Sequence, residues 1–218
     1  MCYNRYMRIR KIEVLSFVVV LATFLVAVLI YPQMPDRIVS HFGLRGEANG
    51  YMGKFWGVFL LPTIMLIIYF IFLFIPRIDP KKENIQKFKK YYDFFILAFM
   101  LFFVYIYALM IFRNLNYSFN FIQFMAPALA LLFYVVGVLL KHAEPNLTIG
   151  IRTPWTITND EVWYKTHKLG SKLFKVVAFI CLLGIILPKY ALYFVLLPVI
   201  ASAVYLVFYS YLEYRKTL

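Results

Sequence analysis

The sequence has few of the residues on which soluble enzymes and disulfide-linked proteins depend. Charged residues make up only 15% of its 218 positions, and it has 2 cysteines. Cys2 precedes the first apolar run and Cys181 lies inside a later one, so we expect neither a disulfide nor a cysteine-based metal site. Lys, Arg, Asp, Glu and His are missing from the central turns of every apolar run. Ion-coupled transporters usually need such a group at mid-membrane depth, so the sequence disfavours coupled transport.

Apolar residues dominate what is present. They make up 63% of the chain, which is more than a soluble domain of this size would carry. The long apolar runs are 14–31, 55–75, 94–112, 121–140, 174–187 and 190–211. We therefore predict an all-α fold, a polytopic membrane helical bundle with six transmembrane helices. The run 174–187 is shorter than the roughly 20 residues that cross a bilayer, so a buried core helix is the alternative there.

The basic residues predict which side of the membrane each connection faces. The net charge of +13 could indicate nucleic-acid binding, but Lys and Arg lie at the ends of the apolar runs, where lipid head groups are the nearer counterions. If the N-terminus is inside, cytoplasmic segments hold 18 Lys and Arg and external segments hold 5. The positive-inside rule thus predicts that both termini are cytoplasmic in a multi-pass protein of the cell membrane. We expect the first run to remain as a helix and not to be cleaved as a signal peptide.

The connection 32–54 is predicted to be a compact external loop. Four glycines allow tight turns, and Asn49-Gly50 is a strong turn signal. Asp36, His41 and Glu47 are of metal-ligand type, but they show no known ligand spacing. We therefore expect a folded cap facing an external ligand and no metal site.

The connection 141–171 is the longest polar stretch and is predicted to be cytoplasmic. Thr158 and Glu161 have the spacing of a capping box, which predicts a helix from Asn159. Trp163 and His167 then share one helix face with Gly170 and Phe174. This face packs either on the protein's own loops or on a partner. The segment has neither H-E-x-x-H nor Cys-x-x-Cys, so we predict no catalytic residue, metal or cofactor.

The same connection resembles the signature of the SdpI immunity-protein family. The matching residues are Asn146, Gly150, Ile151, Arg152, Thr153, Trp155, Thr156, Asn159, Trp163, His167 and Gly170. The external segment 34–47, with Asn49-Gly50, Leu61-Pro62 and the run Pro76-Arg77-Ile78-Asp79-Pro80, is similar to the uncharacterised domain that precedes SdpI-type segments in longer members. Together the two resemblances cover almost the whole chain.

The resemblance implies an organisation, a role and binding residues. It implies an N-terminal hairpin, 1–91, followed by an SdpI-type four-helix segment, 92–218. The expected role is immunity to a secreted toxic peptide, with a cytoplasmic helix-turn-helix repressor as a second partner and no direct contact with nucleic acid. The binding residues implied on the cytoplasmic side are Asn146, Gly150, Arg152, Thr153, Trp155, Asn159, Trp163, His167 and Gly170. Those implied in the external loop are Pro35, Asp36, His41, Phe42, Gly46, Glu47 and Gly50.

Other functions stay open at this point. A permease component for a small apolar molecule or lipid is one, with Tyr69, Tyr105, Tyr107, Tyr134 and Tyr205 as candidates to line a cleft. An enzyme acting on lipid-linked substrates is another, in which Arg152, Glu161 and His167 would do acid and base work on a head group. Arg152 is also a candidate to pair with a lipid phosphate or a helix end.

Overall fold

A computed structural model describes residues 11–43 and 46–218 of the chain, and within them six helices are long and apolar enough to cross a membrane. This confirms the predicted class, an all-α polytopic bundle with six candidate spans. The elements are α1 (Lys11–Ile30), β1 (Arg37–Phe42), β2 (Ala48–Gly53), α2 (Lys54–Ile78), α3 (Lys82–Asn114), α4 (Phe121–His142), α5 (Pro154–Thr158), α6 (Asp160–Ile186) and α7 (Ala191–Arg215). Short 3-10 turns follow α1 and precede α7.

The short fifth apolar run belongs to a long helix. The helix α6 is continuous over 27 residues, because the polar segment after residue 159 and the apolar run form one rod. At 1.5 Å per residue such a helix is about 40 Å long, enough to cross the hydrocarbon layer and extend beyond it. The fifth span is therefore complete by length.

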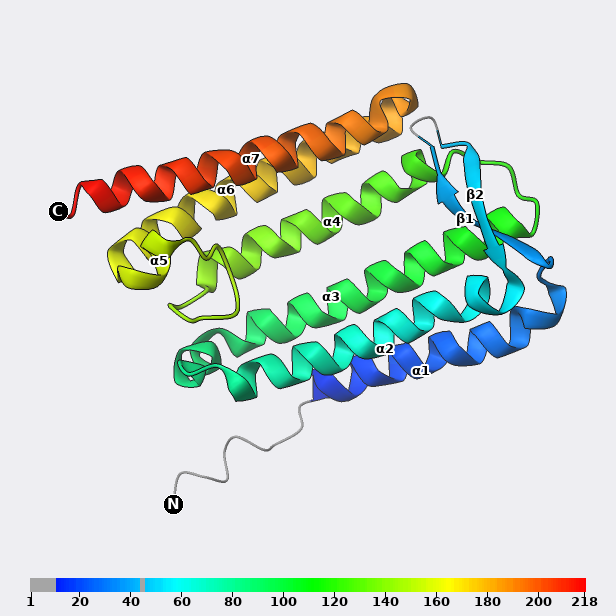
Figure 1. Ribbon diagram of the computed structural model, residues 1–218, viewed down its shortest axis with the longest axis horizontal. Coiled ribbons are helices and arrows are strands. Elements are labelled where there is room, and N and C mark those ends of the chain that lie inside the picture. The colour runs from blue at the N-terminus through cyan, green and yellow to red at the C-terminus, as the bar shows by residue number, and fades with distance from the viewer. Residues whose placement is uncertain (1–10, 44–45) are drawn as a thin grey trace, which may run out of the picture.

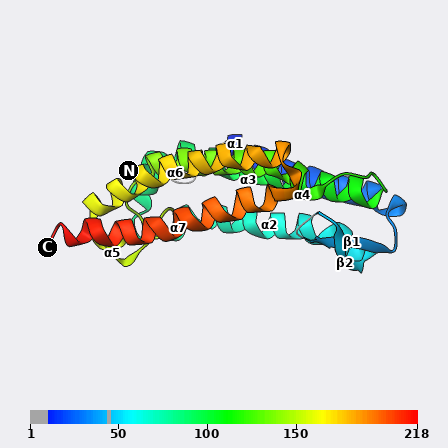
Figure 2. The same ribbon diagram turned by 90° about the horizontal axis from the view of Figure 1, so that it is seen from above.

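The helices form two sets of three. The first is α1, α2 and α3, and the second is α4, α6 and α7, with α3 and α4 side by side between the sets (Figure 1). Seen from above, the bundle is thin, and α2 and α7 lie on the face opposite α1 and α6 (Figure 2). Close approach of α4 to α6 depends on Gly137, where a Cβ would come within 2.9 Å of the Ser171 carbonyl oxygen.

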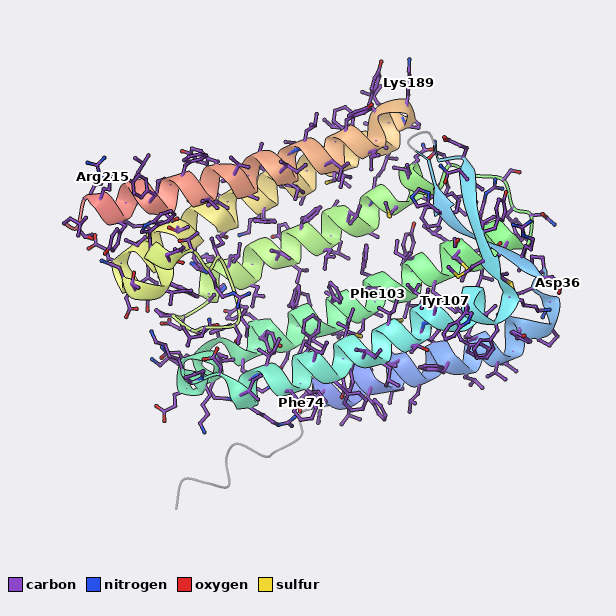
Figure 3. All side chains as sticks on the ribbon, in the orientation of Figure 1. Asp36, Phe74, Phe103, Tyr107, Lys189 and Arg215 are labelled. Atoms are coloured by element: carbon purple, nitrogen blue, oxygen red, sulfur yellow. The ribbon has the colours of Figure 1, made fainter. Side chains whose placement is uncertain are left out.

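The two ends of the bundle carry different structures. Asp36 and Lys189 lie at the end that holds the two strands, and Arg215 lies at the opposite end (Figure 3). We call the first the hairpin end and the second the loop end. The loop end holds the turn between α2 and α3 and the residues between α4 and α6.

The loop predicted at 32–54 contains an antiparallel β-hairpin that the sequence did not predict. Gly43 N–H donates to the Glu47 carbonyl and Gly46 N–H to the Gly43 carbonyl, and Gly46 has a φ of 81°. The turn expected at Asn49-Gly50 is wrong, because both residues lie inside β2. Gly50 pairs with His41, and a Cβ there would come within 2.8 Å of the His41 Cβ. Glycine is needed here for close approach and not for a turn.

Candidate functional site

The loop between α4 and α6, residues 143–159 and hereafter the motif loop, is folded around Asn146. This side chain is buried, and its Oδ1 accepts from the N–H groups of Thr148 at 2.9 Å and Ile149 at 2.6 Å. Its Nδ2 donates to the carbonyls of Glu144 at 2.8 Å and Ile149 at 2.9 Å. Because all four bonds stay within the loop, Asn146 holds the loop in shape.

Asp79 attaches the motif loop to the first set of helices. It is the C-cap residue that follows α2 and is buried, with Oδ1 accepting from Lys81 N–H at 2.7 Å. Oδ2 accepts from Leu147 N–H at 3.0 Å and from the Thr148 hydroxyl at 2.6 Å. Nearby, Asn84 Nδ2 donates to the Pro145 carbonyl at 2.8 Å. Asp79 belongs to the run 76–80 that resembles the uncharacterised domain, but only the structure shows that it attaches the motif loop.

Replacing Asp79 with asparagine is expected to loosen the motif loop. The amide has only one acceptor oxygen, so at least one of the three donors loses its partner, at a cost of about 1–3 kcal/mol. Hydrogen exchange at Leu147 and Ile149 should accelerate in detergent-purified protein. The matched control is Glu83→Gln, an exposed carboxylate nearby. Equal exchange in both variants would contradict this role.

Trp163 and His167 pack on the motif loop from α6. Trp163 is fully buried, and its Nε1 donates to the Ala143 carbonyl at 2.8 Å. The rings of Trp163 and His167 are stacked, with centroids 3.9 Å apart. His167 Nε2 accepts from Ile151 N–H at 3.0 Å, and Nδ1 lies 2.9 Å from the Trp163 carbonyl. These partners require a neutral imidazole with its proton on Nδ1.

Two glycines allow the loop to approach this helix face. Gly150 has a φ of +117°, and a Cβ there would overlap His167 Nε2. A Cβ at Gly170 would come within 2.5 Å of the Ile151 Cδ1. The helix face predicted from the spacing of Trp163, His167 and Gly170 therefore packs on the protein's own motif loop.

A hydroxyl cluster connects the motif loop to α7. Thr153 and Thr156 form the capping box of α5, and the Thr153 hydroxyl donates to the Ser210 Oγ at 3.0 Å. The capping box predicted at Thr158 and Glu161 is wrong. The N-cap of α6 is Asn159, whose Oδ1 accepts from Val162 N–H at 3.1 Å, because Thr158 still belongs to α5.

The remaining motif residues are more accessible. Arg152 is exposed, and its Nη1 donates to the Leu147 carbonyl at 2.9 Å. Trp155 is half-buried, with its ring centroid 5.1 Å from that of Tyr211. Asn159 Nδ2 donates to the Thr217 hydroxyl at 3.3 Å. The motif thus divides into a set that fixes the loop, buried except for the exposed Gly150, and a smaller set that reaches the surface.

At the hairpin end, the strands are fixed to α3 and α4. Asn114 Oδ1 accepts from Val39 N–H at 2.7 Å, so the amide continues the hydrogen bonding of β1. Phe42 stacks on Phe121, with ring centroids 4.0 Å apart. Sequence reasoning missed Asn114, because nothing local to residue 114 indicates a partner 75 positions away.

A cavity of about 830 Å³, the hairpin cavity, lies beneath the strands. It is lined by Ile38, Val39, Ser40, His41, Phe42, Gly43, Glu47, Asn49, Met52, Gly57, Leu60, Leu61, Ile106, Met110, Phe121, Ile122, Met125 and Leu192. Of the seven predicted external site residues, His41, Phe42 and Glu47 are brought together here. Pro35, Asp36, Gly46 and Gly50 do not belong to this lining. His41 Nδ1 is 2.5 Å from Asn49 Oδ1.

A second cavity of about 290 Å³ lies at the loop end. Residues 148–151 of the motif loop contribute to its lining together with side chains of α2, α3, α4 and α6. The five tyrosines considered as cleft residues do not belong to the described lining of either cavity. Tyr69 instead donates to the Glu13 carbonyl, and Tyr105 to that of Phe124.

The groups of the proposed enzyme alternative lie in separate surroundings. His167 is buried with both ring nitrogens engaged, whereas Glu161 is exposed and pairs with Lys165 at 2.8 Å. Across residues 11–43 and 46–218, no group of three or more His, Cys, Asp and Glu side chains is arranged to hold a metal ion.

Comparison with known proteins identifies matches in the N-terminal and the C-terminal parts of the chain. The SdpI/YfhL protein family matches residues 142–210, which contain the motif loop, all of α6 and most of α7. A domain of unknown function, DUF1648, matches residues 18–66, which contain the hairpin. A curated relative, "Immunity protein SdpI" of Bacillus subtilis (strain 168), is 26% identical over 207 residues, covering 94% of this chain and 97% of the relative. No solved structure matches.

Proposed function

The chain belongs to the SdpI family of multi-pass membrane proteins, and from this we propose that it is an immunity protein that counters a secreted toxic peptide. The observation that carries the proposal is the extent of the similarity to "Immunity protein SdpI", which includes the hairpin as well as the motif loop. We propose a role in binding and not in catalysis, because Asn146, Trp163 and His167 of the motif use their polar atoms in hydrogen bonds that hold the loop together.

We propose that the hairpin end faces outward and that both termini and the motif loop are cytoplasmic. The support is the distribution of Lys and Arg, with 18 in segments assigned to the inside and 5 in those assigned to the outside. In this orientation the hairpin meets a peptide that arrives from outside the cell. The motif loop then faces cytoplasmic proteins.

Cysteine labelling in intact cells tests this orientation. In a chain with Cys2→Ser and Cys181→Ala, we expect Tyr51→Cys on β2 to react with a membrane-impermeant maleimide. Lys168→Cys on α6 should react only after permeabilisation. Both parent side chains are exposed, so protein packing blocks neither reaction. The reverse pattern would show the opposite orientation.

We further propose that the loop end binds a cytoplasmic helix-turn-helix repressor. The surface available to it includes Arg152, Leu147 and Ile157, which are exposed on a loop that Asn146 and Asp79 hold in one shape. A fixed loop presents these side chains at little entropic cost. Gly150, Trp163 and His167 then act by positioning the loop.

Gene deletion in the native host tests the proposed function. We expect deletion to make the cells sensitive to the peptide fraction of their own spent medium, and a plasmid copy to restore survival. A second deletion strain carries a plasmid copy with Trp56→Ala, a substitution of an exposed aromatic residue at the start of α2. It is the control for expression from the plasmid. Unchanged survival of the deletion strain would contradict an immunity role.

A further inference from the structure

We propose that the hairpin cavity is the receptor site for the toxic peptide and takes a segment that carries large apolar side chains. This inference rests on the proposed immunity function and names the site and the chemistry of its ligand. It concerns the space between the hairpin, α2, α3 and α4, which is distinct from the motif loop at the other end of the bundle.

The interior of the cavity has the chemistry of an apolar binding site. Its helical walls come from Leu60 and Leu61 of α2, Ile106 and Met110 of α3, and Met125 of α4. Ligand cavities are typically 300–1,000 Å³ and largely apolar, and this cavity of about 830 Å³ falls in that range. Methionine side chains are flexible and adjust to apolar groups of different shapes. A cavity lined by them can therefore accommodate peptide side chains better than a rigid pocket can.

The rim of the cavity is polar and comes from the hairpin. Ser40, His41, Glu47 and Asn49 are exposed and also belong to the lining. A peptide that enters along this rim keeps hydrogen-bond partners for its backbone while its apolar side chains are buried. The lining residues Ile106 and Met110 of α3 are close in sequence to Tyr107, which lies in the part of α3 near the hairpin (Figure 3).

The position of the cavity favours a peptide over a lipid chain as its occupant. A lipid tail already lies in hydrocarbon, so moving it into an apolar cavity gains little hydrophobic free energy. An apolar side chain that arrives from water gains the full transfer free energy. Each large side chain buried in the cavity should therefore raise affinity by roughly tenfold to hundredfold.

Filling the cavity tests the proposal. Met125→Trp places a larger side chain inside the cavity. Phe124→Trp, at the adjacent but outward-facing position, is the matched control. Met110→Phe fills the cavity from α3 and serves as a second variant if Met125→Trp does not elute as a single species. The full chain is reconstituted in nanodiscs of phosphatidylethanolamine and phosphatidylglycerol.

Two photoactivatable probes identify the occupant. One is a synthetic water-soluble peptide whose apolar face carries leucine, phenylalanine and one diazirine-bearing leucine. The other is a phosphatidylethanolamine with a diazirine in its acyl chain. We expect the peptide to cross-link to Ile106, Met110 and Met125 in preference to Leu101 and Leu131, which are exposed on the helix surfaces. The filling variants should reduce cavity cross-linking by roughly tenfold or more, and Phe124→Trp should leave it unchanged.

Three results would overturn the proposal. The first is equal peptide cross-linking inside the cavity and at Leu101 and Leu131. The second is cavity labelling that the filling variants do not reduce. The third is a cavity occupied by the lipid probe that the peptide does not displace.

Survival assays separate this inference from the proposed function. If the native chain protects cells and Met125→Trp protects them equally well, the cavity is not the receptor site although the immunity function stands. If the native chain does not protect, the immunity function fails, and the cross-linking still decides what the cavity binds. Loss of protection in Met125→Trp but not in Phe124→Trp supports both.

Discussion

Replacing Trp163 with alanine is expected to lower the free energy of unfolding by about 3–5 kcal/mol, the range for truncating a large buried aromatic side chain. The indole is fully buried, stacks on His167 and donates to the Ala143 carbonyl. The substitution removes all three interactions from the base of the motif loop. It should be measured by unfolding in mixed detergent micelles, with hydrogen exchange at Ile151 as a local readout.

Two further variants separate the causes of this loss of stability. Trp163→Phe keeps most of the ring area but leaves the Ala143 carbonyl without its donor, so it should cost about 1–3 kcal/mol. Trp56→Ala removes an indole that is 60% exposed and should change stability little. A similar loss in Trp56→Ala and Trp163→Ala would show that buried packing at the motif loop is not the cause.

Replacing Gly150 with alanine is expected to have the second largest effect. The φ of +117° is strained for any residue with a Cβ, which costs on the order of 1–3 kcal/mol. The added Cβ would also overlap His167 Nε2 and break its hydrogen bond with Ile151 N–H. We therefore expect a loss of about 2–4 kcal/mol in the free energy of unfolding, measured in the same micelles.

Gly53→Ala is the matched control for Gly150→Ala. Gly53 ends β2, and a Cβ there meets no atom within 4 Å. The control should stay within about 0.5 kcal/mol of the native chain. If Gly150→Ala were equally mild, the loop would have to adopt a different backbone conformation from the one described.

The membrane helices could be predicted from sequence because hydropathy and length determine them directly. The motif spacing also placed Trp163, His167 and Gly170 on one helix face. It could not say what that face contacts, since the partner atoms lie on Ala143 and Ile151, in a loop without a periodic pattern. The choice between the protein's own loop and a partner needed three-dimensional information.

Local signals failed where two of them competed. Thr158 and Asn159 are both good N-cap residues, and the choice was settled by α5, which extends through Thr158. At residues 49–50 the signal for a turn was overridden by pairing of Gly50 with His41. Such outcomes depend on neighbouring elements that a short window does not contain.

Contacts between distant segments had no local signal. Asp79 and Leu147 are 68 positions apart. The residues around Asp79 give no indication that its carboxylate binds the motif loop. This bond joins the end of α2, the helix that also lines the hairpin cavity through Leu60 and Leu61, to the SdpI-type motif. The division at residues 91 and 92 stays a prediction, because neither family match reaches it.

The most direct test of the proposed immunity role is transfer of the gene into a bacterium that the secreted peptide kills. Colony counts after exposure to the purified peptide should show that cells with the native chain survive, whereas cells with empty vector die. Membrane fractions must contain the native chain in amounts that rule out poor expression. Equal killing of cells with the native chain and with empty vector would contradict the proposed function.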